Sequence, residues 1–172
     1  MSRRCDVYRD LFEHEVASSA AMLQMIASVS IEARDDPRYR QILTLAAHIA
    51  ACRLNWLDRM AGDGLGQVPW WEDDVEESTL VGRYESSNEK WRAYLADLQD
   101  TQAEQDFTFP IADGRSYRWN IEGQLKQLVG HGNYHRGQVV MLVGQLGGET
   151  EDTDYLYWAT ARTDRWGFTP GA

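Results

Sequence analysis

The chain has 172 residues, 43% of them hydrophobic, which is enough apolar side chain for one folded domain with a single core. Its 27 acidic residues outnumber 17 lysines and arginines, so the formal net charge is −10. This charge repels polyanions and argues against a nucleic-acid-binding protein. We therefore expect a single domain over residues 1–172, with residues 163–172 as a tail.

The sequence also bears on location. No stretch approaches the roughly 18 consecutive apolar residues of a membrane span. The N-terminal segment turns acidic and periodic, without the continuous apolar core of a signal peptide. These features predict a cytoplasmic protein that has no membrane partner, in which Cys5 and Cys52 are free thiols.

The first predicted helix covers about residues 6–30, where apolar side chains recur at helical spacing. His14 lies off this apolar stripe, between Glu13 and Glu15. We therefore predict that His14 is a solvated surface histidine.

The second predicted helix begins at Asp36-Pro37, because an aspartate can cap a helix and a proline suits its first position. It ends near Ala61, before three glycines. His48 lies at the edge of the apolar stripe of this helix, one turn before Cys52.

A loop over residues 62–73 contains Trp70-Trp71, which we expect to cover an apolar edge or to line the mouth of a pocket. Asp74 and Glu77 then have the spacing of a capping box, which predicts a third helix over about residues 75–100.

The period then changes from helical to alternating. Residues 106–109 and 115–119 alternate apolar and polar side chains on either side of Asp113-Gly114, which predicts a two-stranded flap. Asn120 is expected to cap a fourth long helix that closes at Gly147-Gly148. A short helix over about residues 154–161 follows. The predicted fold class is all-α: a four-helix bundle with a short β-hairpin flap before the fourth long helix and a short C-terminal helix.

His131 and His135 are four residues apart in the fourth long helix, so their imidazoles share one face, about one turn apart. Such a pair either binds a metal or forms hydrogen bonds across the bundle. His48 adds a third imidazole from another core-facing helix, and three ligands would leave coordination positions open. Cys52 is either a fourth ligand or a small buried hydrophobe.

The neighbours of these histidines allow further interpretations. Arg136 points away from the metal, so an ion pair is favoured over a catalytic role. Gly130 and Gly132 flank His131 and permit close helix approach or room for a ligand. Candidate residues of a substrate pocket are Tyr134, Cys52, Trp119 and Trp158.

The run HGNYHRGQ, which contains His131 and His135, is the most specific part of a wider pattern. Together with His48, the following Leu-Gly-Gly and a terminal Thr-Asp-Tyr-x-x-Trp, it resembles the DinB/YfiT-like family of metalloenzymes over nearly the whole chain. The resemblance implies that His48, His131 and His135 hold one divalent metal, commonly zinc or nickel, often in a homodimer. Some relatives carry a further histidine where this chain has Gln127.

The resemblance also implies a reaction, since characterised relatives activate a low-molecular-weight thiol, such as bacillithiol or mycothiol, for transfer to an electrophile. Our leading hypothesis is therefore a metal-dependent thiol transferase with a small-molecule substrate. One alternative is a metal-dependent hydrolase that uses metal-bound hydroxide as the nucleophile. Another is a non-catalytic metal- or ligand-binding protein of a stress response.

Overall fold

The computed structural model describes residues 3–61, 68–111 and 113–162. Four long helices form its body: α1 (Arg3–Ala27), α2 (Pro37–Ala61), α3 (Glu77–Asp97) and α5 (Ile121–Gln145). The shorter elements are η1 (Ile31–Asp35), α4 (Asp100–Ala103), β1 (Asp106–Pro110), β2 (Ser116–Asn120) and α6 (Tyr155–Thr160). The predicted all-α bundle, with its β-hairpin flap and its short C-terminal helix, is confirmed.

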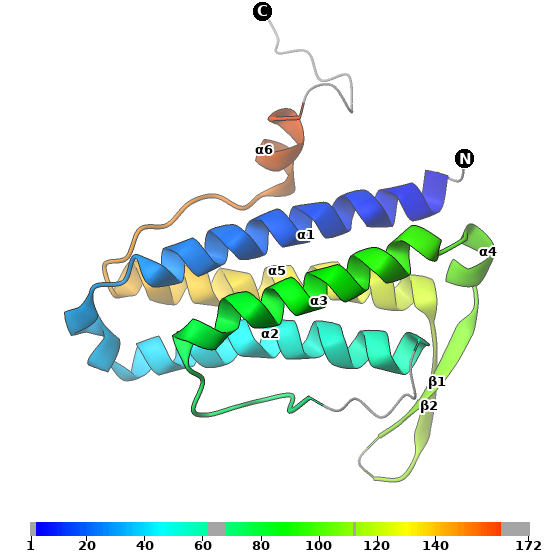
Figure 1. Ribbon diagram of the computed structural model, residues 1–172, viewed down its shortest axis with the longest axis horizontal. Helices are drawn as coiled ribbons and strands as arrows, with labels where there is room; N and C mark the ends of the chain where they lie inside the picture. Colours follow the sequence, from blue (N-terminus) through cyan, green and yellow to red (C-terminus); the bar gives the residue numbers. More distant parts are fainter. Residues whose placement is uncertain (1–2, 62–67, 112, 163–172) are drawn as a thin grey trace, which may run out of the picture.

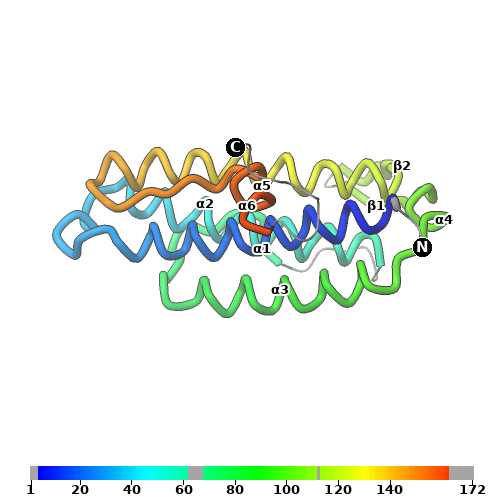
Figure 2. The backbone as a smooth tube through the Cα atoms, turned by 90° about the horizontal axis from the view of Figure 1, so that it is seen from above, coloured from blue at the N-terminus to red at the C-terminus, as the bar shows by residue number. Residues whose placement is uncertain are grey.

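The four long helices lie side by side along the length of the molecule (Figures 1 and 2). α1 packs against α3 and α5, and α2 packs against the same two helices, so α1 and α2 occupy opposite corners of the bundle. α2 and α3 run in the same direction (Figure 1). The chain that connects the end of α2 to the start of α3 must therefore run back along the bundle.

Three of the predicted helix boundaries are formed by the residues that the sequence indicated. Asp36 accepts a hydrogen bond at 2.9 Å from the backbone N–H of Arg38, at the start of α2. Asn120 accepts one from the backbone N–H of Gly123 and caps α5. Gly147 ends α5 with a φ of +76°, a left-handed conformation that glycine adopts without strain.

The predicted capping box of the third helix is wrong. α3 begins at Glu77 and ends at Asp97, and its N-cap, Glu76, makes no side-chain cap hydrogen bond. The Glu77 carboxylate instead accepts hydrogen bonds from Arg34 at 2.6 Å and from the Tyr39 hydroxyl at 2.8 Å. These bonds between separate elements outcompete the local cap.

The flap is an antiparallel hairpin in which Phe107 is opposite Trp119 and Phe109 is opposite Tyr117. Phe109 is buried and packs edge-on against Trp56 of α2, with ring centroids 4.9 Å apart. The hairpin is therefore attached to the C-terminal end of α2.

The buried apolar side chains form two clusters. One includes Met22, Ile42 and Val139, and the other includes Phe12 and Trp91. Between them along the helices lies a buried polar layer that contains Glu15, Ser19, Arg53, Ser87 and Arg136. The core is thus divided by polar side chains that need partners of their own.

An ion network supplies these partners. The Glu15 carboxylate of α1 accepts hydrogen bonds from Arg53 of α2 at 2.9 Å and from Arg136 of α5 at 2.9 and 3.2 Å. All three residues are almost completely buried. Arg136 also donates to Asn133, and Arg53 donates to Ser19 at 2.9 Å. The expected ion pair of Arg136 is therefore present between helices, in the core rather than at the surface.

The prediction that His14 is a solvated surface residue is wrong. His14 is 2% exposed, and its Nε2 atom lies 2.9 Å from the Thr153 carbonyl and 3.0 Å from the Ser18 hydroxyl. The rings of Tyr155 and Trp158 pack edge-on against it. The segment after α5 returns across α1 (Figure 1) and covers this face of the helix.

Gly132 is required by the ion network. A β-carbon there would overlap Oε2 of Glu15 and come within 3.1 Å of its Cδ. We expect Gly132→Ala to lower the free energy of unfolding by about 3 kcal/mol, because it displaces a buried charged group. Urea denaturation measures this change.

Gly130→Ala is the matched control, since a β-carbon at Gly130 meets nothing within 4 Å. We expect it to be neutral or to stabilise the protein by up to about 1 kcal/mol through helix propensity. Equal unfolding free energies for the two variants would contradict the packing role of Gly132.

Candidate metal centre

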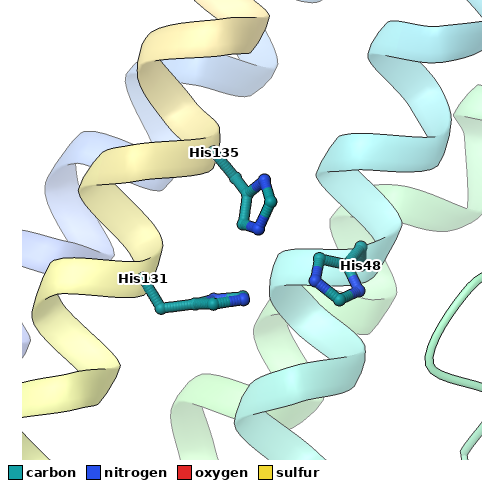
Figure 3. A group of neighbouring side chains, drawn as sticks. All are labelled: His48, His131 and His135. Atoms are coloured by element: carbon teal, nitrogen blue, oxygen red, sulfur yellow. The ribbon is translucent and has the colours of Figure 1, made fainter.

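The structure brings together the three histidines singled out in the sequence. His131 and His135 project from one face of α5, and His48 faces them from α2 (Figure 3). One ring nitrogen from each histidine lies within 4.8 Å of the corresponding nitrogens of the other two. His48 is buried and the other two histidines are partly buried, so the cluster lies at the edge of the bundle core.

Hydrogen bonds orient two of the rings. Nδ1 of His48 lies 2.6 Å from the carbonyl oxygen of Trp70, and Nδ1 of His135 lies 2.7 Å from Oε1 of Gln138. A carbonyl oxygen only accepts, so each Nδ1 carries the proton and each Nε2 keeps its lone pair. This is the protonation pattern of a histidine whose Nε2 binds a metal.

Electrostatics also favours neutral rings. Burial lowers the pKa of His131 to about 4, with further lowering from His135, His48 and Arg53. Burial likewise lowers the pKa of His48. These imidazoles are therefore neutral at pH 7 and have a lone pair available for a cation.

The donor set consists of imidazoles alone. Among the described residues, the cluster of candidate ligand atoms contains no carboxylate and does not include Cys52. Sγ of Cys52 lies 3.5 Å from Nε2 of His48, and burial raises the pKa of this thiol to about 12. A protonated thiol is a poor metal ligand. Three nitrogens, with no fourth protein ligand among the described residues, fit a divalent cation with open coordination positions.

The segment that follows residue 67 holds one side of the cluster in place. Asn55 of α2 forms two hydrogen bonds with the backbone of Val68, at 2.7 and 3.1 Å. The Thr44 hydroxyl donates to the Glu72 carbonyl at 3.0 Å. Together with the bond from His48 to Trp70, these contacts tie residues 68–72 along α2; we refer to these residues as the strap.

The strap places an aromatic ring on the cluster. The indole of Trp71 stacks on the His48 imidazole with centroids 3.5 Å apart and an interplanar angle of 7°. It meets His135 edge-on, with centroids 6.0 Å apart. Trp71 is 55% exposed, so it forms an outer wall of the cluster. The expectation that the tryptophan pair covers an apolar edge or lines the mouth of a pocket stays a prediction.

The residues suggested for a substrate pocket fall into two groups. Cys52 touches His48, and Tyr134, which is 65% exposed, packs edge-on against His135 with centroids 4.9 Å apart. Trp119 instead lies on β2 beside Gly123, in the first turn of α5. Trp158 packs against His14 beyond α1.

Sequence reasoning missed several groups that shape this site. Gln138 follows His135 by one turn within the HRGQ run, and that spacing is a signal that could have been used. The carbonyl of Trp70 and the Arg53–Glu15 pair near His131 leave no comparable trace in the sequence. Their positions depend on how the strap and α1 pack.

The fold and site together define a class: an all-helical bundle whose facing helices present an open cluster of three histidine nitrogens. The model of the DinB family matches residues 1–166, nearly the whole chain, and the protein belongs to the DinB family. No curated protein and no solved structure matches it significantly. No helix in the described part of the chain is long and apolar enough to cross a membrane.

The ligand assignment predicts how metal content responds to substitution. We expect His135→Ala to weaken zinc binding by about 100-fold or more, because one of three donor nitrogens is lost. Gln138→Ala is expected to weaken it by about 10-fold through loss of the orienting bond. Elemental analysis and competition with a chromophoric chelator measure both effects.

Tyr134→Ala is the control for these variants, since it removes an exposed neighbour of His135 that donates no nitrogen. It should retain the zinc content of the parent protein. If His135→Ala also retains that content, the three-histidine assignment is wrong.

The lowered pKa of His131 predicts a pH dependence of stability for the metal-free protein. In the unfolded chain the pKa returns to about 6.5, so between pH 6.5 and pH 4 the unfolded state binds more protons. The contribution of His131 is therefore complete above pH 6.5 and is lost as the pH falls towards 4. Urea denaturation in the presence of a chelator should show a shallower pH slope for His131→Asn than for the parent protein. Identical slopes would contradict this expectation.

Proposed function

We propose that this protein is a divalent-metal-dependent enzyme that transfers a low-molecular-weight thiol to a small electrophilic substrate. His48, His131 and His135 hold one metal ion, zinc or nickel, with positions left for the thiol. The observation that carries the proposal is the donor set, which consists of three imidazole nitrogens within 4.8 Å of one another.

The chemistry follows from that donor set. A cation bound by neutral ligands keeps its full positive charge, lowers the pKa of a thiol beside it and so supplies a thiolate at neutral pH. Carboxylate or thiolate ligands from the protein would weaken this effect. The Trp70 carbonyl and Gln138 fix the proton on Nδ1 of His48 and His135, which keeps each Nε2 directed at the shared centre.

The protein's own thiol beside the centre is not suited to be the nucleophile. Burial raises the pKa of Cys52 to about 12, so it carries a proton at neutral pH. The reacting thiol must then come from solution. Trp71 and Tyr134, both half-exposed or more, flank His135 and offer apolar walls to the incoming substrate.

Two further expectations belong to this proposal. A cytoplasmic location agrees with two buried free cysteines, because a reducing compartment keeps thiols unpaired. A homodimer is the assembly we propose from the family resemblance.

Turnover tests the proposal directly. Zinc- or nickel-loaded protein should consume a thiol in the presence of an aromatic chloride or an epoxide, measured by loss of free thiol and by mass spectrometry of the thioether. We expect His48→Ala to lower kcat/KM by about 100-fold or more. Cys52→Ala should change it by less than about threefold.

The controls separate the alternatives. Turnover of esters or amides without any added thiol would favour a hydrolase. Retention of metal with no binding or consumption of thiols across a broad panel would favour a binding protein. Loss of turnover in Cys52→Ala with metal content intact would make Cys52 the nucleophile.

A further inference from the structure

Arg59, three turns after His48 in α2, has an unusual set of neighbours. Its guanidinium carbon lies 4.8 Å from the ring centroid of Trp56, 4.7 Å from that of Trp70 and 4.9 Å from that of Phe109. Rings from α2, the strap and β1 therefore surround one cation. Such contacts stabilise the positive charge of the guanidinium.

The same guanidinium makes no ion pair or hydrogen bond within the described part of the chain. Its Nε–H is buried and has no hydrogen-bond partner there. Burial lowers the pKa of Arg59, although an arginine remains charged at neutral pH. Arginines elsewhere in the structure, such as Arg53, Arg83 and Arg92, do have carboxylate partners. Asp58, its neighbour in the sequence, acts on Arg59 through its charge, but no carboxylate of the described residues forms an ion pair with this guanidinium.

Helical geometry relates Arg59 to the metal centre. His48, Cys52 and Arg59 are spaced by four and seven residues, which puts all three on one face of α2. Burial raises the pKa of the Cys52 thiol, and the charge of Arg59 partly offsets this rise, so that charge acts on the thiol that touches His48. His48 and Arg59 are separated by a rise of roughly 16 Å along α2, and the longer arginine side chain, which leans towards the N-terminus, reduces the expected separation to roughly 10 Å.

Trp70, a residue of the strap, contacts both the histidine cluster and Arg59. The backbone carbonyl of Trp70 accepts the hydrogen bond from His48, and its indole covers the Arg59 guanidinium. The histidine cluster and the caged arginine therefore share a wall. A ligand that contacted both the histidines and Arg59 would therefore lie along Trp70.

We propose that Arg59 binds an anionic group, a carboxylate or a phosphate, at the far end of the ligand whose sulfur reaches the histidine cluster. This inference rests on the proposed thiol chemistry, and it names the class of thiol. The thiol is one that carries its negative charge on the order of 10 Å from sulfur. Three ring centroids lie within 4.9 Å of the guanidinium carbon, so the anion is expected at N–H groups that the rings leave uncovered.

The first experiment is independent of thiol binding and turnover. In ¹⁵N-labelled zinc-loaded protein, the buried Nε–H of Arg59 should give an NMR signal that is assigned by its loss in Arg59→Met. We expect inorganic phosphate and succinate to shift this signal saturably at constant ionic strength, while the neutral analogue succinamide leaves it in place. No shift, or an equal shift with succinamide, would overturn the inference.

The second experiment connects Arg59 to the thiol. Cobalt-loaded protein is titrated with glutathione and its neutral diethyl ester, and with coenzyme A and phosphate-free pantetheine, and the sulfur-to-cobalt absorption band is followed. We expect the anionic member of at least one pair to bind tenfold or more tightly than its neutral counterpart. The two pairs distinguish a carboxylate from a phosphate. In Arg59→Met this preference should fall below about threefold, with the affinity for the neutral thiol unchanged.

Two control variants test whether the preference for anionic thiols depends on Arg59 itself. Arg40→Met removes an exposed arginine from the same helix and should leave the preference intact. Arg59→Lys keeps the charge and should retain part of it, and circular dichroism establishes that each variant is folded. If neutral and anionic thiols bind equally to the parent protein, the role of Arg59 is wrong and the thiol function stands. If no thiol changes the cobalt spectrum, the thiol function fails and the NMR titration alone decides on Arg59.

Discussion

The bundle depends on one buried carboxylate that accepts hydrogen bonds from two arginines. Glu15 joins α1 to α2 through Arg53 and to α5 through Arg136, at the level where the apolar core is interrupted. Burying these charges is costly unless each has its partners, so a helix shifted by one turn would leave a charge against apolar side chains. The network thereby fixes the register of three helices. Its charges also act on His131: Arg53 adds to the lowering of the His131 pKa by burial, while Glu15 opposes it.

The direction of the helices explains how the histidine cluster is completed. Because α2 and α3 run the same way, the connecting chain has to travel back along the bundle, and its described part follows α2. This path brings the Trp70 carbonyl to His48 and the Trp71 ring onto the same imidazole. A short antiparallel turn between these helices would leave the outer side of His48 open to water. The connection is therefore part of the site as well as part of the fold.

Much of the fold could be predicted from the sequence because local signals and helical periodicity agreed. Asp36, Asn120 and Gly147 stand at the boundaries that their chemistry favours. The histidine cluster was predictable for a similar reason, since four-residue spacing fixes neighbours on a helix without any knowledge of tertiary structure. His48 required only that α2 and α5 face each other.

The errors arose where distant segments decide the environment. His14 has glutamates on both sides in the sequence, yet Glu15 is itself buried by arginines and His14 is covered by the segment around Thr153. Neither fact has a local signature.

Trp70 contacts His48 through its backbone carbonyl and Arg59 through its ring. Occupants at its two ends are thermodynamically linked: if one occupant moves Trp70, the free energy of binding the other changes, and the coupling is equal in both directions.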